Sequence, residues 1–202
     1  GIPNISGHPF QDSIIRRWDG ATWEITNSPI PNPLYAVSML SATEGYAVGE
    51  YGRVLHWNGA GWSNVSVPTV NYLLGVTMVS AADVWAVGSN GKTLHGTSSG
   101  GVTTWAIISA NTADSLRSVF AVSPTDVWAV GGSAASGTSV IRRWNGSTWT
   151  TITSPVTSAL TAVTMLSPTD GWITGYDGTI LQWDGSEWGT VTSPVTVTLN
   201  FS

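Results

Sequence analysis

The sequence predicts an all-β fold made of repeated four-stranded antiparallel units. Four short motifs recur in the same order along the 202-residue chain, with steps of 39, 43 and 44 residues between successive copies. The motifs show the two-residue alternation and the turn residues of short β-strands, and no segment has helical periodicity or helix length. Four antiparallel strands in a unit of about 40–45 residues are typical of a β-propeller blade, with a solenoid of short sheets as the alternative.

The first two strands of each unit carry the first three motifs. The first strand opens with L-x-x-V, at Leu34, Leu73, Leu116 and Leu160. A turn that ends in an acid follows, with the acid at Glu44, Asp83, Asp126 and Asp170. The second strand is aromatic and ends in glycine, at Tyr46–Gly49, Trp85–Gly88, Trp128–Gly131 and Trp172–Gly175. Alternation places the aromatic and third residues of this strand on one face and the second and fourth residues on the other.

Turn residues delimit the third and fourth strands. Ser89-Asn90-Gly91 and Tyr176-Asp177-Gly178 lead into third strands, and their Asn-Gly and Asp-Gly pairs tolerate the positive φ of a tight hairpin. The fourth motif, W-[ND]-G-x-x-W, then turns the chain into the fourth strand, at Trp18–Trp23, Trp57–Trp62, Trp144–Trp149 and Trp183–Trp188. Ser-Pro closes the unit, since proline cannot donate to a ladder and suits an outer edge.

The two ends of the chain favour a closed ring over a solenoid. Four units cover approximately 34–72, 73–115, 116–159 and 160–198 (blades 1 to 4). In the same register, residues 199–202 match the start of a first strand, and residues 1–33 match the second to fourth strands of a further unit.

We therefore expect a single domain over 1–202, a five-bladed β-propeller whose ring is closed by pairing the N- and C-terminal strands in one composite blade (1–33 plus 199–202). Residues 1–13 lack the WAVG pattern, so an irregular second strand is expected there. Supply of the first strand by a neighbouring molecule is the alternative.

These repeats resemble a known group of proteins. WAVG followed by W-[ND]-G-x-x-W at a spacing of about 43 residues resembles the tryptophan-rich bacterial propeller repeats of secreted and surface proteins, over nearly the whole chain. The repeats are similar, more distantly, to photosystem II assembly-factor propellers and to Asp-box propellers; of the Asp-box pattern, Trp183–Trp188 keeps only D-G-x-x-W. The resemblance implies a propeller used for scaffolding, protein binding or glycan binding, and it implies no particular functional residues.

Composition narrows the classes of partner. The net charge is -5 and only 9% of residues are charged, whereas nucleic-acid binding needs clustered Lys and Arg, so no nucleic-acid partner is expected. The absence of cysteine excludes disulfides and thiolate metal sites, and twelve tryptophans packed between blades are expected to stabilise the fold instead. No run of about twenty apolar residues predicts a transmembrane helix. The chain starts at Gly1 without Met or a signal peptide, so a processed or trimmed chain is expected.

The repeated acids and tryptophan pairs each admit two interpretations. The acids could form a ring of carboxylates that binds cations, or they could end turns by accepting local backbone amides. Presence in every blade favours the turn. The tryptophan pairs could stack on sugars, or they could fill space across the turn between two strands. The second interpretation is favoured because cross-strand aromatic pairs stabilise sheets.

The arginines and histidines also have a structural interpretation besides a functional one. The pairs Arg16-Arg17 and Arg142-Arg143 could bind anions, but surface ion pairs that stack on a tryptophan are favoured. The three histidines are expected in different places in the ring, so we expect no metal site and no cofactor. They are His8, His56 and His95. No pattern of catalytic carboxylates, activated nucleophile or phosphate-binding loop is found, so an enzyme is not expected.

Variable loops indicate where a ligand would bind. The loops between second and third strands share one face of the predicted ring, and they read GEYG, GSNG, GGSAASGTS and GYDG from blade 1 to blade 4. Variation on a repeated scaffold is expected where the scaffold presents a site. The candidate ligand-binding residues are Glu50, Tyr51, Asn90, Tyr176 and Asp177.

These features favour a non-catalytic interaction or scaffold module with a protein partner. The low charge and the abundance of Ser, Thr, Gly and Trp are like those of bacterial extracellular domains, so an extracellular or cell-surface location is expected. A lectin-like propeller with a glycan partner is the alternative. Self-assembly through the composite blade is a further option, because that blade joins both ends of the chain.

Overall fold

The computed structural model describes residues 13–193, which form an all-β propeller of four-stranded antiparallel blades. Blade 1 contains β3 (Leu34–Ser41), β4 (Glu44–Gly49), β5 (Val54–Trp57) and β6 (Trp62–Val65). Blade 2 contains β7 (Leu73–Ser80), β8 (Asp83–Gly88), β9 (Thr93–Ser99) and β10 (Val102–Ile107). Blade 3 contains β11 (Leu116–Ser123), β12 (Asp126–Ser133), β13 (Thr138–Trp144) and β14 (Trp149–Ile152). Blade 4 contains β15 (Leu160–Ser167), β16 (Asp170–Gly175), β17 (Ile180–Trp183) and β18 (Trp188–Thr190).

Residues 13–193 form four complete blades, whereas five were expected from the whole sequence. A separate two-stranded sheet, β1 (Ile15–Trp18) paired with β2 (Trp23–Thr26), stands where the third and fourth strands of the composite blade were expected. The expected second strand falls within residues 1–12 and the expected first strand within 199–202. Both segments lie outside the described residues, so the pairing of the two ends stays a prediction.

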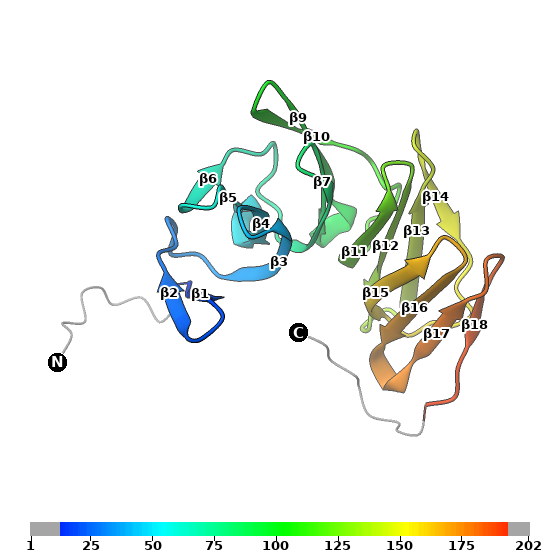
Figure 1. The fold of residues 1–202 in the computed structure, drawn as a ribbon. Helices are drawn as coiled ribbons and strands as arrows, with labels where there is room; N and C mark the ends of the chain where they lie inside the picture. The colour runs from blue at the N-terminus through cyan, green and yellow to red at the C-terminus, as the bar shows by residue number, and fades with distance from the viewer. Residues whose placement is uncertain (1–12, 194–202) are drawn as a thin grey trace.

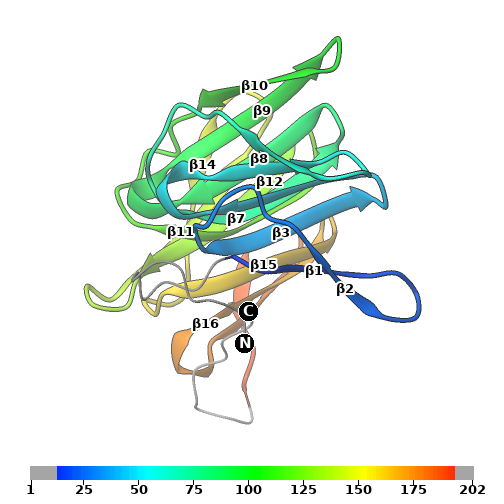
Figure 2. The same cartoon turned by 90° about the vertical axis from the view of Figure 1, so that its left-hand side faces the viewer.

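The blades surround a common centre, as the propeller prediction requires. The first strands β3, β7, β11 and β15 are innermost and contact one another in sequence, and the fourth strands lie on the outside (Figure 1). Figure 2, turned by 90°, also places β1 next to β3. The two-stranded sheet therefore sits beside blade 1, at the opposite end of the described arc from blade 4.

Most of the core lies between neighbouring blades. In β8, Trp85 and Val87 pack on blade 3, where Trp144 is one of their neighbours, whereas Ala86 packs on Val48 of blade 1. This confirms the predicted alternation of the aromatic strand. The second strands of blades 1 to 3 are buried on both faces, whereas Trp172 and Thr174 of β16, at the end of the arc, are only partly buried. A blade therefore needs two neighbours to cover its apolar residues.

The glycine that ends the aromatic strand allows a close approach between strands one and two. A Cβ at Gly88 would lie 1.9 Å from the carbonyl oxygen of Tyr72, and the following amide, that of Ser89, donates to the same oxygen at 2.9 Å. Any side chain at this position would push the two strands apart. The same amide-to-carbonyl bond recurs in the other blades, from Glu50 to Pro33, from Gly132 to Ser115 and from Tyr176 to Ala159.

The predicted tight turns between second and third strands are present in three blades as short 3₁₀ turns. They are η1 (Glu50–Gly52), η2 (Ser89–Gly91) and η3 (Tyr176–Gly178). The middle residue of each turn is left-handed, with φ of 53° at Tyr51 and 56° at both Asn90 and Asp177. Blade 3 lacks such a turn because its longer loop extends the β12–β13 ladder to Ser133 and Thr138. Among residues 13–193, no helix has the length and apolar character needed to cross a membrane.

Candidate functional site

The repeated acid does not end a turn in the way expected from the sequence. In the first-to-second-strand turn the serine performs that role, for example Ser123, whose Oγ accepts from the amide of Thr125 at 3.3 Å. The acid begins the second strand and reaches across to the third strand. Asp126 binds Arg143 through two hydrogen bonds of 2.8 and 3.0 Å, and the Arg143 guanidinium lies 4.7 Å from the ring centroid of Trp128.

Equivalent groups occur in blades 1 and 2. Glu44 accepts from His56 at 2.8 Å, and Asp83 accepts from His95 at 2.9 Å. Each histidine ring also stacks on the aromatic residue of the neighbouring strand, as His95 does on Trp85 at 4.0 Å between centroids. The acid, the aromatic ring and the base thus form a repeated triad inside the blade. This arrangement gives these side chains a structural role.

Blade 4 breaks this triad. Gln182 occupies the place of Arg143 opposite Trp172, and one carboxylate oxygen of Asp170 is buried without a hydrogen-bond partner among the described residues. Nothing in residues 13–193 brings three or more His, Asp or Glu side chains into an arrangement that could hold a metal ion, and His8 lies outside that range.

The tryptophan pairs pack across their own turns, as the structural interpretation predicted. Trp144 and Trp149 are directly opposite in the β13–β14 ladder, with ring centroids 5.9 Å apart. Both then pack against Trp85 of the preceding blade. In blades 3 and 4 both rings of the pair are buried and cannot serve as sugar-stacking surfaces, whereas in blade 1 Trp57 is buried and Trp62 is partly buried.

The candidate residues Glu50 and Tyr51 belong to an exposed group on the face of the second-to-third-strand turns. Tyr35 from β3 donates to the Glu50 carboxylate at 3.0 Å. Tyr72, which precedes β7 of the next blade, packs edge-on against Tyr51 at 5.4 Å and lies 6.3 Å from Tyr35. We call Tyr35, Tyr51 and Tyr72 the tyrosine cluster; all three side chains are exposed.

The other candidates lie elsewhere on this face. The guanidinium of Arg117 lies over the ring of Tyr176 in blade 4, 5.7 Å from its centroid. The carboxylate of Asp177 accepts a hydrogen bond from the Ser158 hydroxyl at 3.1 Å. Asn90 is exposed in blade 2 and takes part in none of these contacts. The five candidates therefore lie at three separate turns, η1, η2 and η3, and the structure does not gather them into one site. Whether any of the five binds a ligand stays a prediction.

Tyr35 and Tyr72 were missed by the sequence analysis. Both flank the L-x-x-V motif: Tyr35 follows Leu34, and Tyr72 precedes Leu73. The fourth-to-first-strand links end on the same face as the second-to-third-strand turns. Aromatic residues next to the L-x-x-V leucine were therefore a usable signal for surface tyrosines on that face.

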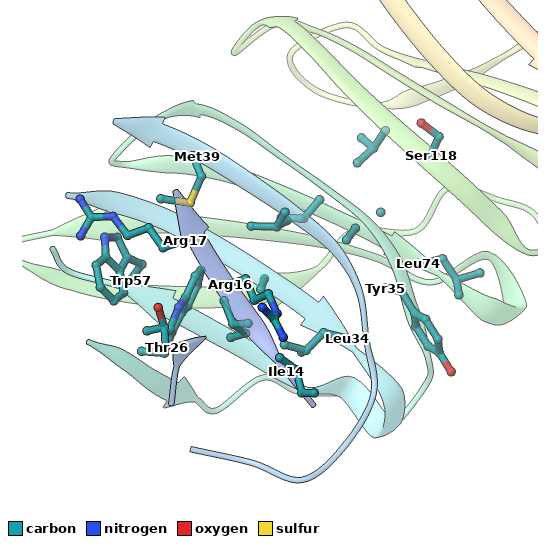
Figure 3. A pocket seen from close by; sticks show the side chains of 18 of the residues that line it. Ile14, Arg16, Arg17, Thr26, Leu34, Tyr35, Met39, Trp57, Leu74 and Ser118 are labelled. Atoms are coloured by element: carbon teal, nitrogen blue, oxygen red, sulfur yellow. The ribbon is translucent and has the colours of Figure 1, made fainter. Parts of the chain in front are cut away.

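A cavity of about 940 Å³ opens at the centre of the arc. Its wall is formed by the first strands of the blades on one side and by the two-stranded sheet on the other (Figure 3). Met39 and Tyr35 line it from β3, Leu74 and Ser118 from the next first strands, and Arg16 from β1. Arg17 lies over Trp57, 5.5 Å from the ring centroid, as Arg143 lies over Trp183 at 5.9 Å.

Comparison with known proteins supports the fold and leaves the family open. No protein-family model matches the chain, and no curated protein matches it. Solved structures with a similar fold include YCF48 bound to a D1 peptide (TM-score 0.60, 17% identity, 85% of this chain and 57% of that chain). YCF48 from Cyanidioschyzon merolae is also similar (TM-score 0.64, 15% identity, 93% and 66%), as is a streptogramin B lyase (TM-score 0.69, 14% identity, 83% and 57%).

These identities show a shared fold alone. The chain spans 57–66% of the length of the three structures. The YCF48 matches agree with the distant similarity to photosystem II assembly-factor propellers that the repeats indicated. Membership of the tryptophan-rich bacterial repeat group stays a prediction.

Proposed function

We propose that this chain is a non-catalytic interaction module that binds a protein partner on the face of the second-to-third-strand turns. The observation that carries the proposal is the tyrosine cluster, an exposed aromatic group at one blade junction of an otherwise repeated scaffold. Tyrosine is enriched in protein interfaces because it combines a large apolar surface with a polar hydroxyl. The similar fold of YCF48, whose structure contains a bound D1 peptide, supports a peptide or protein as the partner class. The setting we propose is extracellular or on the cell surface.

A lectin is the competing function, and the arrangement of the candidates disfavours it. A lectin with one site per blade would repeat the same exposed group in most blades. Tyr51 is replaced by Asn90 in blade 2 and by Asp177 in blade 4 at the equivalent turn position. At the second-to-third-strand turns, an exposed aromatic side chain is thus found in blade 1 and not in the equivalent position of blades 2 and 4.

We also propose that residues 1–202 form one five-bladed ring. Val37 in β3 is 61% exposed, whereas its equivalents Val76, Val119 and Val163 are 8%, 7% and 6% exposed. Each of these three lies on a first strand that contacts the first strand of the preceding blade. The first strand that would cover Val37 is the one that we assign to residues 199–202. Residues 1–12 would then supply the second strand, between that first strand and β1.

Peptide and glycan arrays, probed with the full chain, test the proposed function. We expect saturable binding to a class of peptides, no saturable binding to glycans, and loss of the peptide signal in Tyr51→Asn. Light scattering on the same sample is expected to give the monomer mass. Saturable binding to one glycan class without peptide binding would support the lectin instead. A dimer or polymer mass would indicate that first strands are exchanged between copies.

A further inference from the structure

The tyrosine cluster is assembled from three different positions of the repeat. Tyr35 follows the first leucine of strand one, Tyr51 is the middle residue of η1, and Tyr72 ends the link into blade 2. The equivalents of Tyr35 are Leu74, Arg117 and Thr161 in the other blades. No single repeat position therefore explains the cluster, because its three tyrosines come from three different positions of the repeat and meet at one junction.

Tyr51 occupies a backbone conformation that favours other residues. Its φ of 53° and ψ of 34° are left-handed, where asparagine and aspartate are enriched and bulky residues are rare. Asn90 and Asp177 occupy the same conformation in blades 2 and 4. The backbone at position 51 favours asparagine or aspartate, and the tyrosine there presents an exposed ring that packs edge-on against Tyr72.

The cluster carries an acid that has no cationic partner among the described residues. The ion pairs of residues 13–193 are those of Glu44, Asp83 and Asp126, and Glu50 is in none of them. The nearby Arg53 donates to Asn32 instead. Burial and the hydrogen bond to Glu50 raise the pKa of Tyr35 to about 12, so its phenol stays a neutral donor at physiological pH. The pKa of Tyr72 is also raised, chiefly through the Tyr51 hydroxyl.

We propose that the tyrosine cluster and Glu50 form a subsite for a cationic side chain, arginine or lysine, of a peptide partner. The aromatic faces attract a cation through their quadrupoles, and the Glu50 carboxylate pairs with its charge. Arginine fits best because its planar guanidinium stacks on rings and binds carboxylates with two donors. The net charge of -5 attracts a basic partner at longer range. This inference rests on the proposed protein-binding function and adds the chemistry of the ligand.

Nuclear magnetic resonance on the full chain with ¹³C-labelled tyrosine tests the subsite. The chain has five tyrosines, and the buried Tyr46 serves as an internal reference. The probes are an acetylated, amidated glycine-rich heptapeptide with one central arginine, the same peptide with lysine, and the same peptide with citrulline, which keeps the shape of arginine without its charge. We expect saturable shifts of the Tyr35, Tyr51 and Tyr72 signals with arginine, smaller shifts with lysine, and none with citrulline.

Three variants separate binding from folding. Glu50→Gln keeps an acceptor for the Tyr35 hydroxyl but removes the charge, and we expect at least a tenfold loss of arginine-peptide affinity. Tyr51→Asn is expected to lose affinity to a similar degree while its melting temperature stays the same or rises, because asparagine suits the left-handed turn. The control is Leu166→Ala, an exposed residue next to the opposite turn of blade 4, which should bind like the original chain.

Two results would overturn the inference. Equal shifts with the arginine and citrulline peptides would show that the charge is not recognised. Unchanged tyrosine signals at millimolar arginine peptide would show that the cluster is not a cation subsite. If the peptide array nevertheless identified acidic or apolar ligands, the protein-binding function would stand and only its cationic specificity would fail.

Discussion

At the scale of single residues, the asparagine or aspartate of W-[ND]-G-x-x-W makes the same hydrogen bonds in every copy of the motif. Each side chain accepts hydrogen bonds from two backbone amides of its own turn, at 2.7–3.0 Å, in all four copies of the motif. These residues are Asp19, Asn58, Asn145 and Asp184. The two acids gain charge stabilisation from these bonds, and backbone hydrogen bonds accordingly lower the pKa values of Asp19 and Asp184 from 3.8.

This residue-scale feature predicts a pH dependence of stability. A carboxylate with a lowered pKa in the folded state stabilises the fold above its unfolded pKa, and the stabilisation is lost as the pH falls through the folded value. Asp184→Asn is therefore expected to lose less stability than the original chain between pH 6 and pH 2.5. Urea denaturation across that range measures the effect. The reciprocal variant Asn145→Asp should become more acid-sensitive, and equal pH profiles for all three proteins would contradict the assignment.

At the scale of the element, the acid–aromatic–base triad ties the second strand to the third strand of a blade. Blades 1 to 3 satisfy the triad with His56, His95 or Arg143, whereas blade 4 has Gln182. One carboxylate oxygen of Asp170 in blade 4 is buried without a hydrogen-bond partner in residues 13–193. Such an acceptor lowers the stability of the fold at this position.

This element-scale difference predicts a stabilising substitution. Gln182→Arg is expected to supply the missing donor to Asp170 and to stack on Trp172, as Arg143 does on Trp128. The gain should be about 0.5–1 kcal/mol, because the site is partly exposed and solvent screens the pair. The midpoint of urea denaturation measures it. Gln182→Lys serves as the control, since lysine brings the charge without the planar fork; an equal gain from lysine would indicate a general charge effect.

At the scale of the whole molecule, the described arc ends in two faces that have no neighbouring blade among the described residues. One face belongs to the two-stranded sheet and the other belongs to blade 4. Trp18 and Trp23 on the two-stranded sheet are 49% and 63% exposed, although their equivalents Trp183 and Trp188 are 3% and 4% exposed. Those equivalents are covered by Trp128 of the preceding blade. In a five-bladed ring, Trp172 of blade 4 would cover Trp18 and Trp23 in the same way.

The proposed ring closure predicts how two tryptophan substitutions compare. Trp188→Ala should lower the free energy of unfolding by about 3–5 kcal/mol, as expected for a buried tryptophan. Trp23→Ala should have a loss of the same order if the ring is closed. A change within about 0.5 kcal/mol would mean that Trp23 is an exposed surface residue and that the arc is open. Deletion of residues 194–202 is a second check, expected to destabilise the closed ring or to change its mass in light scattering.

The sequence by itself determined the repeat, the order of the strands, the left-handed turns at Asn90 and Asp177, and the orientation of Trp85 and Val87. These features follow from local rules: two-residue alternation, turn residues and motif spacing, each repeated several times and therefore easy to recognise. The prediction of local backbone partners for the repeated acids was wrong for Glu44, Asp83 and Asp126. Their basic partners lie 12–17 residues away on another strand, and only the register brings the two together.

Only the tertiary structure decided where an exposed site gathers. The tyrosine cluster joins residues of two blades that share no motif, since Tyr35, Tyr51 and Tyr72 meet through the packing of β3, η1 and the link into β7. The blade count depends on whether two segments at opposite ends of the chain pair. Contacts between distant segments leave no periodic signal in the sequence, and they arise only when the ring brings the blades together.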